Sequence, residues 1–195
     1  MPETPEEFYA RIGGDPLPLP DVVSWDPFPF EGELTVKPLR AHEPEEPRPG
    51  EDGNPCWRCD NPDERVIWRD EHWTLAPLAE ASGMPLVTIL ETREHMDFGH
   101  MNDELASEFG RISARIVRIV EGMPGIVRCH LGRWGDGGSH HHVWFFGRPE
   151  GFGQLRGSFA TVWDDILPPG PEDVRRADLA HVAQRLAHHG GQALV

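Results

Sequence analysis

Residues 135–149 read GDGGSHHHVWFFGRP, in which a glycine-rich turn leads through three histidines into an apolar, aromatic segment. An apolar run bounded by glycines predicts a short buried strand over residues 143–146. Side chains alternate along a strand, so one face would receive His140, His142, Trp144 and Phe146, and the other His141, Val143 and Phe145. Three consecutive histidines are also typical of an expression tag, but a tag lies at a terminus and lacks an apolar continuation. A buried strand that contains histidines only for packing stays open as an alternative.

The composition of the 195-residue chain is that of an acidic protein with one domain and extensions. Its formal net charge of −15 argues against the phosphate-neutralising surface that nucleic-acid binding requires. No segment approaches transmembrane length, and the start, MPETPEEF, lacks the basic and apolar regions of a signal peptide. Three cysteines, an odd number, suit a reducing compartment. We therefore expect a cytoplasmic protein that binds neither nucleic acid nor membrane.

Composition divides the chain into three parts, residues 1–50, 51–150 and 151–195. The first part is rich in proline and acidic residues, which disfavour long helices and central strands, so we expect an N-terminal arm. Its aromatic clusters, at residues 8–9 and 25–30, favour packing over the domain or a partner chain. An arm that serves as a protein-interaction element is a further interpretation.

The rest of the chain predicts strands around one long amphipathic helix, followed by a helical C-terminal extension. The long helix would start after the capping residue Asn102 and end near Glu121. A second helix, over residues 172–187, would have Val174, Leu179, Val182 and Leu186 on its apolar side. The predicted strands are a hairpin of residues 66–68 and 73–76, then 86–90, 126–131 and 143–146, and a further helical segment covers 158–167.

Cys56 and Cys59 lie in a turn-rich loop, NPCWRCDNP, with the spacing of two thiolates that bind one metal ion. A redox-active pair would require the first cysteine at a helix start within a βαβ unit, and no such pattern surrounds it. Two unrelated thiols are the remaining alternative. The pair supplies half of a tetrahedral site, so two further ligands must come from elsewhere.

His95 and His140 are the natural donors for the other half of this site. His95 follows the predicted strand 86–90 and His140 precedes strand 143–146, so both reach the cysteine loop if those strands are antiparallel neighbours. A Cys2His2 site of this kind is closed and structural and suits zinc. Taken on its own, a single histidine in a polar loop, such as His95, is more often a surface residue than a ligand.

His142 is left free and lies beside the glycine-rich loop. Backbone N–H groups in such loops approach phosphate closely, which makes Gly137, Gly138 and Ser139 candidate substrate contacts. A neutral histidine next to bound phosphate can attack phosphorus as a nucleophile. A hairpin turn whose glycines merely supply positive φ is the alternative.

From Cys56 to Pro149 the order of these features resembles the histidine-triad (HIT) superfamily of nucleotide hydrolases and transferases. The shared features are a Cys-x-x-Cys loop, a hairpin, a strand followed by a histidine, a long helix, and a strand that carries His-x-His. The zinc-bearing branch, which is similar to galactose-1-phosphate uridylyltransferase, matches better. The resemblance implies an α+β fold with an antiparallel sheet of about five strands packed on the long helix. Symmetric homodimers are common in this superfamily, so it also implies a homodimer.

The resemblance assigns roles to individual residues of this sequence. It implies a zinc site of Cys56, Cys59, His95 and His140, and a nucleophilic role for His142, which would form a covalent nucleotidyl intermediate. Glu80 lies near the position of an acidic ribose ligand. Trp144 stands where the family has a third histidine or a glutamine, and an indole offers one N–H donor but cannot protonate a leaving group.

The function that follows is hydrolysis or nucleotidyl transfer at the α-phosphate of a nucleotide conjugate. The alternative is a non-catalytic, zinc-stapled protein that binds a nucleotide or metabolite, with Trp144 stacked on a base. The retained His142 favours the enzyme, and the Trp144 substitution favours the binding protein.

Overall fold

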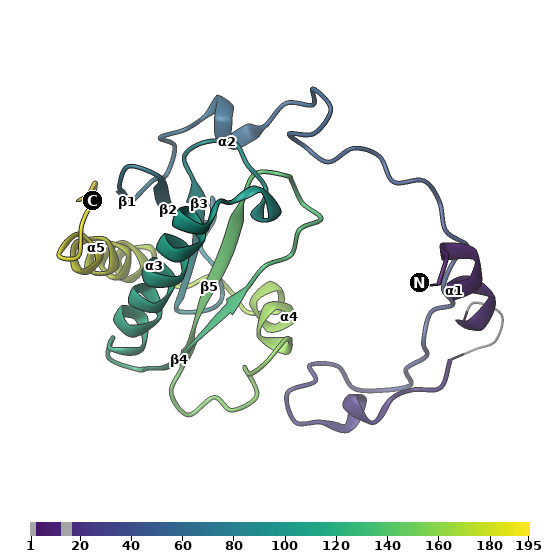
Figure 1. The fold of residues 1–195 in the computed structure, drawn as a ribbon. Coiled ribbons are helices and arrows are strands. Elements are labelled where there is room, and N and C mark those ends of the chain that lie inside the picture. The colour runs from purple at the N-terminus through teal and green to yellow at the C-terminus, as the bar shows by residue number, and fades with distance from the viewer. Residues whose placement is uncertain (1–2, 13–16) are drawn as a thin grey trace. The chain divides into compact units, whose positions relative to one another are not determined.

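The computed structural model describes residues 3–12 and 17–195, which belong to two compact units, Met1–Glu46 and Pro47–Val195 (Figure 1). The first unit contains the helix α1 (Pro5–Ile12) and a short 3-10 helix, η1 (Asp21–Ser24). Thr4 and Glu7 exchange side chain to backbone hydrogen bonds, a capping box that starts α1. Neither helix contains a buried residue.

The second unit is built on a six-stranded antiparallel sheet of strand order β4-β5-β3-β2-β1-β6. The predicted strands are all present, and β3 and β5 are antiparallel neighbours as the metal-site hypothesis requires. The expected number of about five strands omits β6, a two-residue strand that pairs with β1 at the edge. The strands are β1 (Trp68–Arg69), β2 (Trp73–Pro77), β3 (Leu86–Thr92), β4 (Ile126–Gly132), β5 (His142–Pro149) and β6 (Gln192–Ala193).

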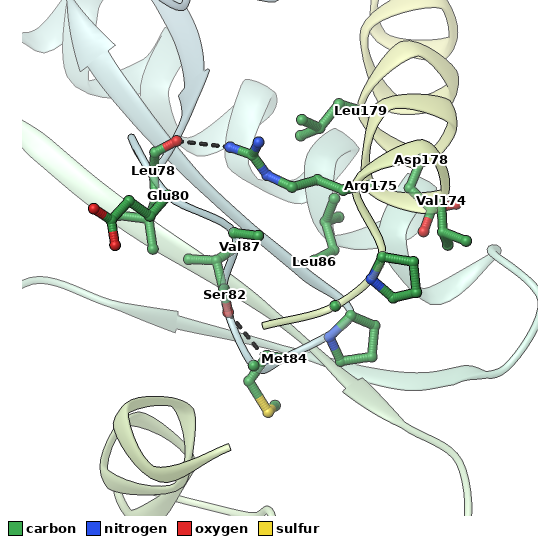
Figure 2. A pocket seen from close by; sticks show the side chains of 15 residues that line it. Leu78, Glu80, Ser82, Met84, Leu86, Val87, Val174, Arg175, Asp178 and Leu179 are labelled. Carbon is green, nitrogen blue, oxygen red and sulfur yellow. Dashed lines mark hydrogen bonds between the residues drawn. The ribbon is translucent and has the colours of Figure 1, made fainter. Parts of the chain in front are cut away.

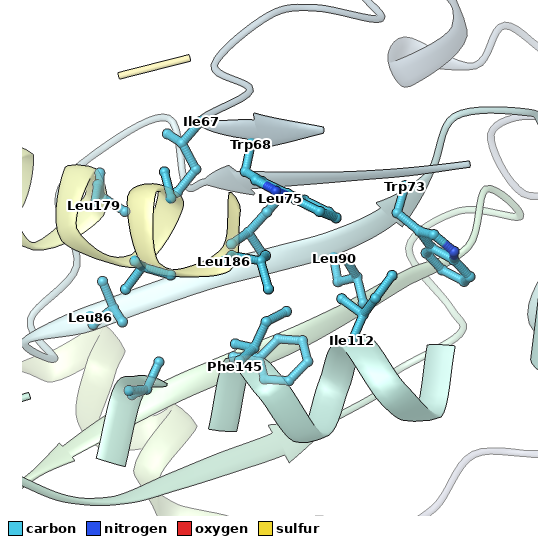
Figure 3. Close-up of a cluster of buried hydrophobic side chains, with 14 of the residues drawn as sticks. Ile67, Trp68, Trp73, Leu75, Leu86, Leu90, Ile112, Phe145, Leu179 and Leu186 are labelled. Carbon is cyan, nitrogen blue, oxygen red and sulfur yellow. The ribbon is translucent and has the colours of Figure 1, made fainter. Parts of the chain in front are cut away.

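Two helices pack against one face of the sheet and form the main core. α3 (Asp103–Glu121) begins where predicted, because the Asn102 side chain accepts a hydrogen bond from the Leu105 N–H. α5 (Glu172–Ala187) lies beside α3, and both bury apolar side chains against alternate residues of the central strands (Figure 3). On the predicted apolar side of α5, Leu179, Val182 and Leu186 are buried, whereas Val174 in the first turn is 50% exposed. The core includes Leu75, Leu90, Ile112, Ile116, Phe145, Leu179, Val182 and Leu186.

The opposite face of the sheet is covered by a smaller element, α4 (Phe159–Ile166). Ala160 of this helix packs in a second cluster with Val87 and Phe146, which alternate with the main-core residues along β3 and β5. Trp144 packs against the same cluster, so the predicted alternation of β5 is confirmed. No helix of the described residues is both long and apolar enough to cross a bilayer.

His141 is enclosed on the main-core face of the sheet. Its imidazole lies 5.4–5.6 Å, centroid to centroid, from the rings of Trp73, Phe98 and Phe109, and it is 1% exposed. Neither ring nitrogen has a hydrogen-bond partner among the described residues. Burial lowers the pKa of His141 to about 4, so the imidazole is neutral near pH 7. A buried polar group without a partner reduces the stability of the fold.

We expect His141→Phe to stabilise the protein, because the ring would pack among aromatic residues without two unpartnered polar atoms. The gain should be about 1–2 kcal/mol, which corresponds to a melting temperature several degrees higher at this chain length. Thermal unfolding followed by circular dichroism measures it, with His188→Phe at the exposed end of α5 as the control. A lower melting temperature for His141→Phe alone would show that the imidazole contributes to stability.

Candidate metal centre

Two thiols and two imidazoles converge at one end of the sheet. One ligand atom each from Cys56, Cys59, His95 and His140 lies within 4.8 Å of all the others. The Nδ1 atom of His140 is 3.4 Å from the Cys56 Sγ and 3.6 Å from the Cys59 Sγ, and the His95 Nδ1 is 3.4 Å from the Cys59 Sγ. The predicted group of four is therefore present, and it can hold a metal ion.

The topology of the sheet explains why these side chains meet. β3 ends at Thr92 and β5 starts at His142, and because the two strands are antiparallel neighbours these ends lie side by side. His95 and His140 thus lie just beyond the same end of the sheet, where β3 finishes and β5 begins. Cys56 caps the one-turn helix α2 (Trp57–Asp60), which presents the second thiol one turn later.

The orientation of the imidazoles fits a metal ligand set. The Nε2–H of the buried His140 donates to the Thr92 carbonyl at 2.7 Å, which leaves the lone pair of Nδ1 facing the thiols. The Nε2 of His95 lies 3.3 Å from the Ser139 hydroxyl. Two sulfur and two nitrogen donors are the tetrahedral set typical of structural zinc sites.

The protonation of the free donors makes metal binding dependent on pH. Burial raises the pKa of the Cys59 thiol to about 11, and the neighbouring Cys56 adds to the shift. Burial lowers the pKa of His140, which keeps that imidazole neutral and able to bind a metal. A metal must displace the thiol proton, so affinity increases with pH.

Arg58, between the two cysteines, fixes their loop to the sheet through a buried ion pair. Its guanidinium Nη2 lies 2.5 Å from a carboxylate oxygen of Glu91 on β3, and both side chains are about nine-tenths buried. The same guanidinium donates to the carbonyls of Asn61 and Glu64 at 3.2 and 3.1 Å, which closes the loop on itself. We did not predict this contact, because an arginine in a polar loop gives no sequence signal of burial.

We expect Arg58→Met to destabilise the protein strongly, because it leaves the Glu91 carboxylate buried without its cation. Breaking such a pair typically costs about 3–5 kcal/mol, which urea unfolding measures. The double variant Arg58→Met with Glu91→Leu should recover much of that loss, since neither charge is then left alone. If the double variant is no more stable than Arg58→Met, the pair is not what fixes the loop.

His142, the predicted nucleophile, lies next to the metal centre with both ring nitrogens near backbone carbonyls. Nδ1 is 2.8 Å from the His140 oxygen, and Nε2 is 3.1 Å from the Trp134 oxygen. A neutral imidazole carries one N–H, so only one of these contacts can be a hydrogen bond when the ring is neutral. With the proton on Nδ1, the Nε2 lone pair faces the loop that precedes β5.

The glycine-rich loop is fixed by a network of charges rather than by left-handed glycines. None of Gly135, Gly137 and Gly138 has positive φ, so the alternative of a hairpin turn that requires it is not supported. Arg48 donates to the Gly135 carbonyl at 2.5 Å and to the Asp97 carboxylate at 2.7 Å.

Asp97 joins this loop to the segment that follows β3. It also accepts a hydrogen bond from Arg133 at 2.5 Å. Although burial opposes ionisation, the bonds from Arg48, Arg133 and the Phe98 N–H outweigh it and lower the pKa of Asp97 to about 2. The carboxylate is therefore charged throughout the physiological range. Arg48, Asp97 and Arg133 were not among the predicted site residues.

The predicted substrate contacts do not all gather beside His142. The N–H and hydroxyl of Ser139 both donate to the Pro49 carbonyl, and the Ser139 hydroxyl oxygen lies 3.3 Å from the Nε2 of His95, so this serine contacts a candidate metal ligand. Trp144 lines a cleft with Trp134, whose carbonyl faces His142. Glu80 lines a separate cavity of about 280 Å³ near the start of α5, where Arg175 donates to the Leu78 carbonyl at 2.7 Å (Figure 2).

Comparison with known proteins gives matches in structure and none in sequence. No protein family matches the chain, and no curated protein matches it in sequence. A histidine triad (HIT) protein from Sinorhizobium meliloti aligns with 64% of this chain and 91% of its own, at 16% identity and a TM-score of 0.51. A hypothetical histidine triad nucleotide-binding protein from Sulfolobus tokodaii covers 67% of this chain and 90% of its own, at 10% identity and a TM-score of 0.48. A zinc-bound histidine triad family protein from Mycobacterium smegmatis covers 64% of this chain and 88% of its own, at 18% identity and a TM-score of 0.46.

The expected fold class is thereby confirmed. The second unit is an α+β structure with an antiparallel sheet packed on helices and a Cys2His2 group at one edge. Together with the match to the Sinorhizobium meliloti protein, this architecture gives the chain a HIT-like fold.

Proposed function

We propose that this protein is a zinc-stapled enzyme that hydrolyses or transfers a nucleotidyl group at the α-phosphate of a nucleotide conjugate. The observation that carries the proposal is the position of the His142 ring between two backbone carbonyls. Its Nδ1 lies 2.8 Å from the His140 carbonyl and its Nε2 lies 3.1 Å from the Trp134 carbonyl; in the tautomer with the proton on Nδ1, the Nε2 lone pair is available for attack on phosphorus. The HIT-like fold supports a nucleotide as the ligand.

Zinc is the ion that the donor set favours. Cys56, Cys59, His95 and His140 supply four ligands, so the site is closed and leaves no position for an activated water. When bound, the ion would hold the cysteine loop against the ends of β3 and β5. Its effect on His142 would be indirect, since His140 supplies both a ligand nitrogen and the carbonyl that orients the His142 ring.

The chemical step uses His142 as the nucleophile. Its Nε2 must first separate from the Trp134 carbonyl, which lies 3.1 Å away, as phosphate enters beside the loop. Nε2 then forms a bond to phosphorus while the bond to the leaving group breaks, and the leaving group takes the electron pair of that bond. Water or another acceptor next attacks the nucleotidyl-histidine, which restores the free imidazole.

A second candidate function is favoured by Trp144. An indole cannot protonate a leaving group, and no other described residue lies within hydrogen-bond distance of the His142 ring as a proton donor. A non-catalytic protein that binds a nucleotide or metabolite would keep the same zinc centre. The two candidates differ only in whether a bond to phosphorus is made.

We expect the purified, untagged protein to contain about one zinc ion per chain, because four donors of the right type already converge. Cys59→Ser should reduce the zinc content well below that value, since the thiolate is a direct ligand. Elemental analysis measures both. Cys129→Ser is the matched control, because Cys129 lies on β4 outside the group of four and its loss should leave the zinc content unchanged.

We expect the protein to release product from an adenosine phosphoramidate or a dinucleoside polyphosphate, and His142→Asn to abolish turnover without loss of nucleotide binding. Asparagine keeps a polar side chain but cannot form the phosphorus–nitrogen bond. Chromatography measures turnover, and mass spectrometry after acid-free quenching detects the nucleotidyl protein. Intact binding with neither turnover nor the covalent intermediate would establish the binding protein instead.

A further inference from the structure

A cleft with aromatic walls and an acidic rim lies on the sheet face opposite the main core. Its volume is about 490 Å³, and it is open to solvent. We propose that this cleft binds an organic cation, such as the ammonium group of a small molecule. The residues that line it are Leu78, Trp134, Trp144, Phe146, Thr161, Asp164 and Asp165.

The aromatic wall is built by the pairing of β4 with β5. Trp144 and Phe146 are two residues apart on one face of β5, and their rings lie nearly parallel at 5.8 Å between centroids. Gly132 is paired with Trp144 across the sheet, and a Cβ atom at Gly132 would lie 2.5 Å from the Trp134 ring. The absence of a side chain at residue 132 therefore lets the Trp134 indole lie on the sheet beside Trp144.

The acidic rim comes from α4, which lies outside the region of the HIT resemblance. Asp164 is held in place, because one of its carboxylate oxygens accepts hydrogen bonds from the Ser82 hydroxyl and the Met84 N–H. Its other oxygen and the exposed Asp165 carboxylate have no hydrogen-bond or ion-pair partner among the described residues. No lysine, arginine or histidine is among the described residues that line the cleft.

This combination selects for positive charge. A cation above an indole face is attracted by the ring, and two carboxylates at the rim add to that attraction. The same carboxylates would repel a phosphate, so the cleft is not suited to the anionic part of a nucleotide. The formal net charge of −15 increases the local concentration of small cations.

The proposal is independent of catalysis by His142 and is tested with a matched pair of ligands. Choline and 3,3-dimethylbutan-1-ol have nearly the same shape and differ in charge. We expect choline to bind the full-length protein about tenfold more tightly than the neutral alcohol, which isothermal titration calorimetry measures. Two-dimensional NMR should show that choline shifts the indole N–H signals of Trp134 and Trp144.

Variants identify the groups responsible. Trp144→Leu and Asp165→Asn should each weaken choline binding several-fold, whereas Asp173→Asn, an exposed carboxylate at the start of α5, should not. Choline binding is measured in the absence of any nucleotide conjugate, so failure of the proposed chemistry and failure of this inference give different results. Equal affinity for choline and the neutral alcohol, or choline binding that Asp165→Asn and Asp173→Asn reduce equally, would overturn the proposal.

Discussion

The antiparallel pairing of β3 with β5 is the constraint on which the site depends. It places the segment that follows Thr92 beside the segment that precedes His142, so that His95 and His140 meet at one edge of the sheet. The cysteine loop joins them because Arg58 is paired with Glu91, which lies opposite His142 in the register of the same two strands. If the register shifted by one residue, Glu91 and His142 would no longer lie opposite each other, and their side chains would be on different faces of the sheet.

Much of the fold could be predicted because its elements have strong periodic patterns. The helix that starts at Asn102 has a capping residue and a regular apolar stripe, and the central strands are apolar runs bounded by turn residues. The metal ligands could be predicted because the spacing of Cys56 and Cys59 supplies half of a tetrahedral site, and His95 and His140 flank two neighbouring strands. β6 could not be predicted, since a strand of two residues has no period, and helical spacing alone does not show that Val174 is half exposed.

The charged residues that hold the cysteine loop and the glycine-rich loop in place could not be predicted, for a different reason. Arg58, Asp97 and Arg133 are charged side chains in polar loops, where most such residues are solvated and contribute little. Their importance arises from partners distant in the sequence, such as Glu91 for Arg58, and only the tertiary structure brings those partners together. The same holds for Trp134, whose position depends on the missing side chain at Gly132.

The separation of the metal ligands along the chain also bears on how the protein folds. Cys56 and His140 are 84 residues apart, so joining them in an unfolded chain costs about 4 kcal/mol in loop-closure entropy. The helix and hairpins between them form local contacts that shorten this distance before the ligands meet. Metal capture is therefore expected to be a late kinetic step, which follows collapse of the sheet and does not nucleate it.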